Sequence, residues 1–157
     1  MSSQDLKFEI KRLDRLSHIR ETFVDVAEAG VKLAEQQVAG IEAAAAEVAR
    51  KIQHAMEELA HPKNATGMTI QTTQNYLQLL RSRAKEIQRS LDAAMVLVDQ
   101  RRAEWTEARR EQKVVETMQE RRVHEWVRQD ATAAQKVVDE VSIGRFVREI
   151  RDLKPET

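Results

Sequence analysis

A chain of 157 residues favours a single domain, and this one is 33% charged and 4% aromatic, with four glycines and two prolines. So few turn-forming residues argue against a sheet protein, whereas the abundance of Ala, Glu, Lys, Arg, Gln, Leu and Val is typical of long helices or coiled coils. The formal net charge of zero provides no overall attraction to nucleic acid or to an anionic membrane.

The sequence also lacks membrane and secretion signals. No apolar run approaches the roughly 18 residues that a membrane-spanning helix needs. The first residues, Met1 to Asp5, have neither the basic nor the apolar region of a signal peptide. The chain contains no cysteine, so it has no disulfide and no thiolate metal site. We expect a cytoplasmic protein without direct membrane insertion.

The first predicted element is a helix over residues 6–60. Apolar residues recur along it at heptad spacing in two stripes, with Ser17 and Arg20 as the two exceptions. A repeat sustained over eight heptads indicates a coiled coil rather than an ordinary surface helix. The two stripes are Ile10, Ser17, Val24, Val31, Val38, Ala45, Ile52 and Leu59, and Leu6, Leu13, Arg20, Ala27, Ala34, Ile41, Val48 and Ala55.

A turn is predicted over residues 61–67. Pro62 lacks an amide hydrogen and disfavours the helical conformation at His61. Gly67 is a residue that tolerates positive φ. Pro, Asn, Thr and Gly within seven residues therefore predict a break between two helices.

The second predicted helix covers residues 69–150, with Thr69, Thr72 and Thr73 as alternative N-caps. Its seam is apolar near the turn but becomes polar after Ala108, although Trp126 still falls on it three heptads after Trp105. The apolar stripes are Ile70, Leu77, Ala84, Leu91, Val98 and Trp105, and Leu80, Ile87, Ala94, Arg101 and Ala108; the polar continuation is Gln112, Gln119, Arg122, Gln129 and Lys136.

These elements predict an all-α fold: one two-helix antiparallel coiled-coil hairpin over residues 1–157 with a C-terminal helical overhang. The turn places Ile52 near Leu80, and Leu6 opposite Trp126. Residues after Trp126 then have no partner in the chain, with Gly144 as a plausible kink or helix end. An apolar face remains there that should meet another molecule, fold back on the hairpin or pair with a second copy: Val137, Val138, Val141, Ile143, Phe146, Val147 and Ile150.

No catalytic motif is present, so the chain is predicted not to be an enzyme and to need no cofactor or metal. It lacks the phosphate-binding loop, the dinucleotide-binding glycine pattern and the zinc-protease pattern. The adjacent acids Asp139 and Glu140 point to different sides of a helix, and the four histidines have no metal-ligand spacing. Arginine pairs alternate with glutamates, as on a solvated coiled-coil face, which argues against a nucleic-acid partner.

The segment from Trp105 to Phe146 resembles the flagellar export protein family FliJ. Members carry an aromatic residue, a run like ARxExKxxExLxER, a second aromatic residue and then a Gln-Lys and an Asp-Glu pair. Here these are Trp105, the run from Ala108 to Arg121, Trp126, Gln135-Lys136 and Asp139-Glu140. Met118 replaces the usual leucine, and Trp126 replaces the commoner tyrosine.

This resemblance implies a non-enzymatic component of the flagellar type III export apparatus, acting in flagellum biogenesis and chemotaxis. It implies a central stalk of the hexameric export ATPase that also contacts the export-gate membrane protein and escorts substrate chaperones. The location would be cytoplasmic and peripheral to the inner-membrane apparatus. The implied ATPase-binding residues are Arg121, Arg122, Trp126, Gln135, Lys136, Asp139 and Glu140, and the implied gate-binding residues are Tyr76, Leu80 and Arg83.

Three alternatives remain open at this point. The related stalk protein of virulence-type secretion systems has the same architecture. A structural coiled coil could self-associate through its overhang. A holdase chaperone could use the apolar face after Val137.

Overall fold

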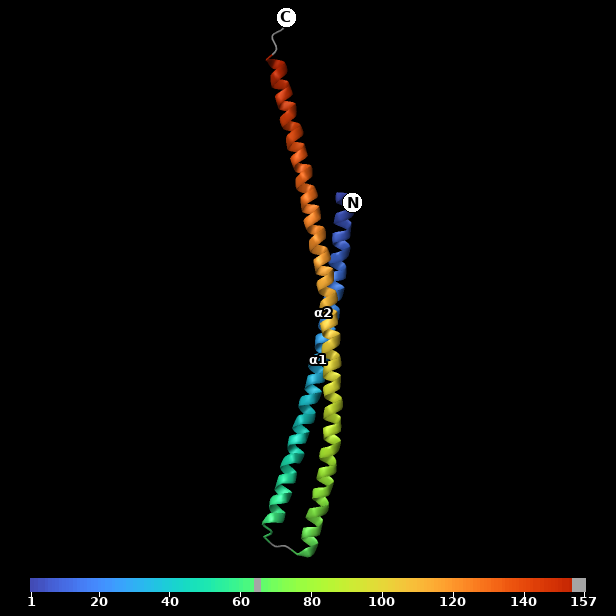
Figure 1. Cartoon of the computed structure of the whole chain (residues 1–157), viewed down its shortest axis with the longest axis vertical. Coiled ribbons are helices and arrows are strands. Elements are labelled where there is room, and N and C mark those ends of the chain that lie inside the picture. The colour runs from blue at the N-terminus through green and yellow to red at the C-terminus, as the bar shows by residue number, and fades with distance from the viewer. Residues whose placement is uncertain (64–65, 154–157) are drawn as a thin grey trace. The chain divides into compact units, whose positions relative to one another are not determined.

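A computed structural model describes residues 1–63 and 66–153 and contains two long helices, α1 (Ser3–Ala60) and α2 (Gly67–Asp152) (Figure 1). No strand occurs in these described ranges. The all-α hairpin is therefore confirmed, and each helix starts two or three residues before the predicted position. Asn64 and Ala65 of the predicted turn lie outside the described residues.

Ser2 caps the N-terminus of α1. Its hydroxyl accepts a hydrogen bond from the Asp5 amide at 3.1 Å, and the Asp5 carboxylate accepts one from the Ser2 amide at 3.1 Å. This reciprocal pair is a capping box, which satisfies amide groups that have no partner inside the helix. The hydrogen bonds from Ser2 lower the pKa of Asp5 because they stabilise its carboxylate form.

The N-cap of α2 is Thr66, so the predicted alternatives Thr69, Thr72 and Thr73 were wrong. The amide of Thr69 donates to the Thr66 hydroxyl at 3.3 Å, and the Ile70 amide donates to the Thr66 carbonyl at 3.1 Å. Gly67 is the first helical residue, and no described glycine has positive φ. Helix α2 thus begins directly after its cap, Thr66. The prediction that Gly67 adopts a positive φ in the turn was also wrong.

The chain divides into two compact units, each with a segment from both helices. We call Phe23–Ala108 the turn unit, and Met1–Thr22 together with the chain from Arg109 onward the terminal unit. In the turn unit the helices run antiparallel from the turn. Its core packs apolar side chains of both helices: Val48, Leu80 and Ile87, with Ile41, Ala45, Ile52 and Ala84 against them.

The terminal unit has a thinner apolar core. Leu6 is fully buried, and Leu13 and Val115 are each 6% exposed. Val115 lies seven residues after Ala108 on the predicted stripe, so the apolar seam of α2 continues one heptad further than expected. Beyond it the seam positions Gln119, Arg122 and Gln129 of α2 are half-buried, and polar contacts between the helices accompany the buried Leu6 and Leu13 of α1.

The end of α2 has no partner from α1 within the terminal unit. Every described residue after Gln129 is exposed except Gly144, which is half-buried (Figure 1, orange to red). This confirms the predicted overhang. The helix runs through Gly144 to Asp152, so the predicted break there was wrong. A glycine inside a helix only lowers its stability relative to alanine.

Neither helix could span a membrane, as far as the described residues show, because neither contains a sufficiently long apolar stretch.

Candidate partner-binding surfaces

Two of the residues predicted to bind the ATPase instead hold the two helices of the terminal unit together. The Arg122 side chain pairs with Glu9 of α1 at 3.1 Å and with Glu125 of its own helix at 2.9 Å. The Trp126 indole donates a hydrogen bond to the Ser3 hydroxyl at 3.2 Å. Arg122 and Trp126 are both half-buried by these contacts. Their direct contribution to a partner surface is therefore restricted.

Trp126 also marks the place where α1 begins. The Lys7 ammonium lies 5.3 Å from the centroid of the indole ring, a distance at which a cation and an aromatic face attract. Three residues further along α2, the Gln129 amide donates to the Met1 carbonyl at 3.4 Å. Beyond this point α2 continues alone.

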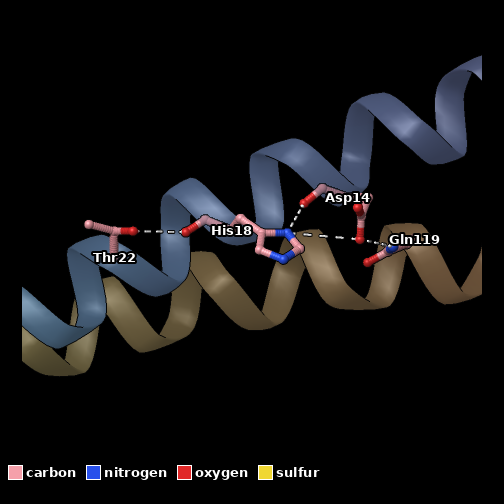
Figure 2. Close-up of polar contacts among 4 residues, drawn as sticks. All are labelled: Asp14, His18, Thr22 and Gln119. Carbon is pink, nitrogen blue, oxygen red and sulfur yellow. Dashed lines mark hydrogen bonds and ion pairs between the residues drawn. The ribbon is translucent and has the colours of Figure 1, made fainter.

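Polar pairs link α1 and α2 further into the terminal unit. Arg20, the charged exception in the predicted heptad stripe, is ion-paired with Glu111 of α2. The Gln119 amide donates to the Asp14 carboxylate at 3.4 Å (Figure 2). Polar side chains at seam positions thus find polar partners on the facing helix, which explains why this seam tolerates them.

The His18 side chain also contacts Asp14. Its Nδ1 donates to the Asp14 carbonyl at 2.8 Å and lies 3.9 Å from the Asp14 carboxylate (Figure 2). The hydrogen bond to the carbonyl and the charge of the carboxylate both raise the pKa of His18.

A basic groove of about 900 Å³ lies along α2 where α1 begins. Four cationic side chains line it against one carboxylate, Glu125. Arg121, Arg122 and Lys136 of this lining were predicted from the sequence, but Arg128 was not. Arg128 lies one heptad after Arg121, and that spacing could have identified it. The lining residues are Arg121, Arg122, His124, Glu125, Arg128, Gln129, Thr132, Ala133 and Lys136.

The remaining predicted ATPase-binding residues lie on the exposed overhang. Gln135 donates from its amide to the Asp139 carboxylate one turn later, at 2.8 Å. Lys136 and Glu140 are also exposed. All four side chains can be reached from solvent.

The apolar residues of the overhang do not share one face, contrary to the prediction. In a continuous α-helix, with about 100° between successive residues, they form two stripes about half a turn apart. Each of their side chains is 45% to 63% exposed. One stripe holds Val137, Val138 and Val141, and the other holds Ile143, Phe146, Val147 and Ile150.

Of the three residues predicted to bind the export gate, one is buried in the turn-unit core and two are exposed. Leu80 is 7% exposed and packs in the core with Val48 and Ile87. Tyr76 is 45% exposed, and Arg83 is exposed and pairs with Glu86 at 3.5 Å. Only Tyr76 and Arg83 therefore offer side chains that a partner could touch.

No cluster of side chains suited to a metal ion occurs in the described part of the chain. The pairs His18–Asp14 and His54–Glu58 each bring one histidine and one carboxylate together on successive turns of α1, which is two side chains rather than a metal-binding cluster.

Comparison with known families matches residues 9–151 to the model of the flagellar FliJ protein. The matched range contains most of both helices. No curated protein and no solved structure shows significant similarity to the chain.

Proposed function

Because the chain belongs to the FliJ family of flagellar proteins, and is therefore a component of the flagellar export apparatus, we propose that it acts as the central stalk of the hexameric export ATPase. In this role it binds the ring with its terminal unit and promotes assembly and activity of the ATPase without doing chemistry itself. The match to a flagellar family favours this system over the virulence-type alternative.

The observation that supports the stalk role is the change from two helices to one within the terminal unit. The paired region ends near Gln129, and every residue of the overhang from Asp130 to Asp152 is exposed except Gly144. A single helix with two apolar stripes can enter a narrow central channel and contact different subunits on different sides.

The basic groove adds an electrostatic element to this surface. Arg121, Arg128 and Lys136 are exposed, and the groove that they line has one carboxylate. An acidic segment of the ATPase is the complementary partner, because opposite charges steer association and fix orientation. The overhang would then supply apolar contacts beyond the groove.

The proposed effect on the ATPase is differential binding. A ring of six similar subunits meets a stalk without matching symmetry, so the subunits are contacted unequally. A stalk that binds one subunit conformation better than another shifts the population toward that conformation. Activation then arises from contact alone.

The test measures ATP hydrolysis by the purified ATPase with and without the protein. A chain that ends after Asp130 keeps the contacts of Trp126 and Gln129 with α1 and should remain helical, but we expect it to lose stimulation. Arg128→Glu combined with Lys136→Glu should weaken stimulation. Lys85→Glu, an exposed charge reversal in the turn unit, is the matched control. Full stimulation by the shortened chain would refute the stalk role.

The turn unit is the proposed site for the export gate, through Tyr76 and Arg83. Tyr76→Ala should reduce binding to the gate protein and leave stimulation of the ATPase unchanged. Loss of both activities together would argue against a separate gate site. Escort of substrate chaperones is proposed from family membership, and co-purification of a chaperone with the full chain tests it.

A further inference from the structure

A second groove, of about 490 Å³, lies along residues 8–19 of α1 in the terminal unit. It shares no lining residue with the basic groove of α2. Its lining runs from Phe8 to Ile19 and includes Met118 of α2. We call it the α1 groove. The proposed stalk role uses none of these residues.

Apolar side chains line the α1 groove at different depths. Leu13 is buried, at 6% exposed, and Leu16 is half-buried. Phe8, Ile19 and Met118 are 74%, 52% and 45% exposed. Phe8 and Ile19 are separated along the helix by about 16 Å, or roughly three turns. The exposed apolar surface therefore has the length of a short helical segment.

Three cations accompany these apolar side chains, and Lys11, Arg12 and Arg15 are all exposed. None of the three has an ion pair within the described part of the chain. Glu9, which also lines the groove, is already paired with Arg122 at 3.1 Å. The α1 groove therefore carries an excess of positive charge, although the net charge of the whole chain is zero.

The cations of the α1 groove also repel one another. Residues three and four positions apart are neighbours on a helix surface, and like charges at that spacing lower the stability of the helix. Lys11 and Arg12 precede Arg15 at these spacings, and His18 and Ile19 follow it. None of these four neighbours is acidic. A carboxylate from another molecule would relieve the repulsion.

The order of these residues along α1 specifies what fits the groove. Phe8, Arg12, Arg15 and Ile19 follow one another at intervals of four, three and four residues, so they share one side of the helix. Apolar side chains lie at both ends of this side, and guanidinium groups lie between them. The complement is a helix with an apolar residue at each end and carboxylates between them, because opposite charges fix the orientation of a bound segment.

The depth of the groove favours a helix over a membrane surface. Leu13 and Leu16 are less exposed than Phe8 and Ile19, so part of the apolar lining is recessed. A side chain of a partner helix can enter such a recess. A layer of lipid headgroups contacts mainly the outermost side chains.

We propose that the α1 groove binds an acidic amphipathic helix of another protein. Carboxylates of that helix accept hydrogen bonds from Arg12 and Arg15, and such charged pairs are stronger than neutral hydrogen bonds. Its apolar side chains pack against Phe8, Ile19 and Met118. The site goes beyond the stalk role, because none of its residues belongs to the overhang or to the proposed gate site.

Fluorescence anisotropy of a labelled synthetic peptide tests the proposal on the full chain. The peptide is a helix of about four turns with leucine at each end of one side and two glutamates between them. We expect saturable binding that weakens by about tenfold or more when both glutamates are replaced by glutamine. No binding of the acidic peptide, or equal binding of the glutamine peptide, overturns the proposal.

Charge reversal locates the site. Lys11→Glu combined with Arg15→Glu should reduce the affinity for the peptide by about tenfold or more. Arg81→Glu combined with Lys85→Glu is the matched control, because it reverses an exposed arginine and an exposed lysine at the same spacing in the turn unit. Circular dichroism verifies that both variants remain helical. An equal loss of affinity in the two variants would refute the α1 groove as the site.

Methyl NMR of the unaltered chain gives an independent measurement. The acidic peptide should shift the methyl resonance of Met118 and leave that of Met95, which is 53% exposed in the turn unit, unchanged. Equal shifts of both resonances would contradict binding at the α1 groove.

Vesicle flotation distinguishes a helix from a lipid surface. We expect the chain to float with neither phosphatidylglycerol nor phosphatidylcholine vesicles. Flotation with phosphatidylglycerol vesicles that Lys11→Glu combined with Arg15→Glu abolishes would assign these cations to an anionic membrane and overturn the proposal.

Discussion

Arg122 of α2 lies with its Nε 3.1 Å from Oε2 of Glu9 on α1, and the two side chains are 34% and 31% exposed. The pair connects residues more than a hundred positions apart at a point where the apolar seam of α2 has become polar. Polar contacts therefore act together with the buried Leu6 and Leu13 of α1 in the last paired turns of the terminal unit.

Replacing Glu9 by Gln should lower the free energy of unfolding by up to about 1 kcal/mol, because a partly exposed ion pair contributes modestly. Glu28→Gln is the control, since the Glu28–Lys32 pair is more exposed and lies within one helix. Urea unfolding followed by circular dichroism measures both. A larger effect of the control would contradict the importance of the Glu9–Arg122 contact.

Leu80→Ala should destabilise the hairpin by about 2 kcal/mol, because it removes a buried side chain from the turn-unit core. Leu79→Ala changes the adjacent leucine, which is 67% exposed, and should alter stability by less than about 0.5 kcal/mol. Thermal unfolding compares the two variants. Similar melting temperatures would mean that Leu80 is not part of the core.

Thr66→Ala should lower stability by about 1 kcal/mol through loss of the hydroxyl that caps α2. Thr72→Ala is a matched control, because the Thr72 hydroxyl bonds back to the Met68 carbonyl inside the helix and caps nothing. Hydrogen exchange of the first amides of α2 gives a local measurement. Unchanged exchange in Thr66→Ala would exclude the capping role.

His18 should titrate with a pKa above its ordinary value, and NMR of its ring protons can follow this. Its contribution to stability is fully present below the pKa of the unfolded chain and is lost as the pH rises through the higher folded pKa. Asp14→Asn removes the carboxylate charge but keeps the carbonyl acceptor, so the pKa should fall part of the way. An unchanged pKa in this variant would mean that the carboxylate charge has no influence.

The sequence by itself determined the two helices, the break between them and the overhang. Heptad spacing is a local property of the chain, and Pro62 acts on its immediate neighbours, so neither depends on distant contacts. The buried positions Leu6, Leu13, Val48 and Ile87 all lie on the predicted stripes.

Only the tertiary structure decided which side chains pair and which remain exposed. Arg20 interrupts a heptad stripe, and its partner Glu111 is 91 residues away, so no local pattern could identify the pair. Leu80 and Tyr76 stand one helical turn apart, yet burial against α1 places one in the core and leaves the other accessible. The reason is physical: burial and ion pairing depend on which segment faces a residue, whereas the heptad pattern and the helix-breaking proline involve only residues close together in the sequence.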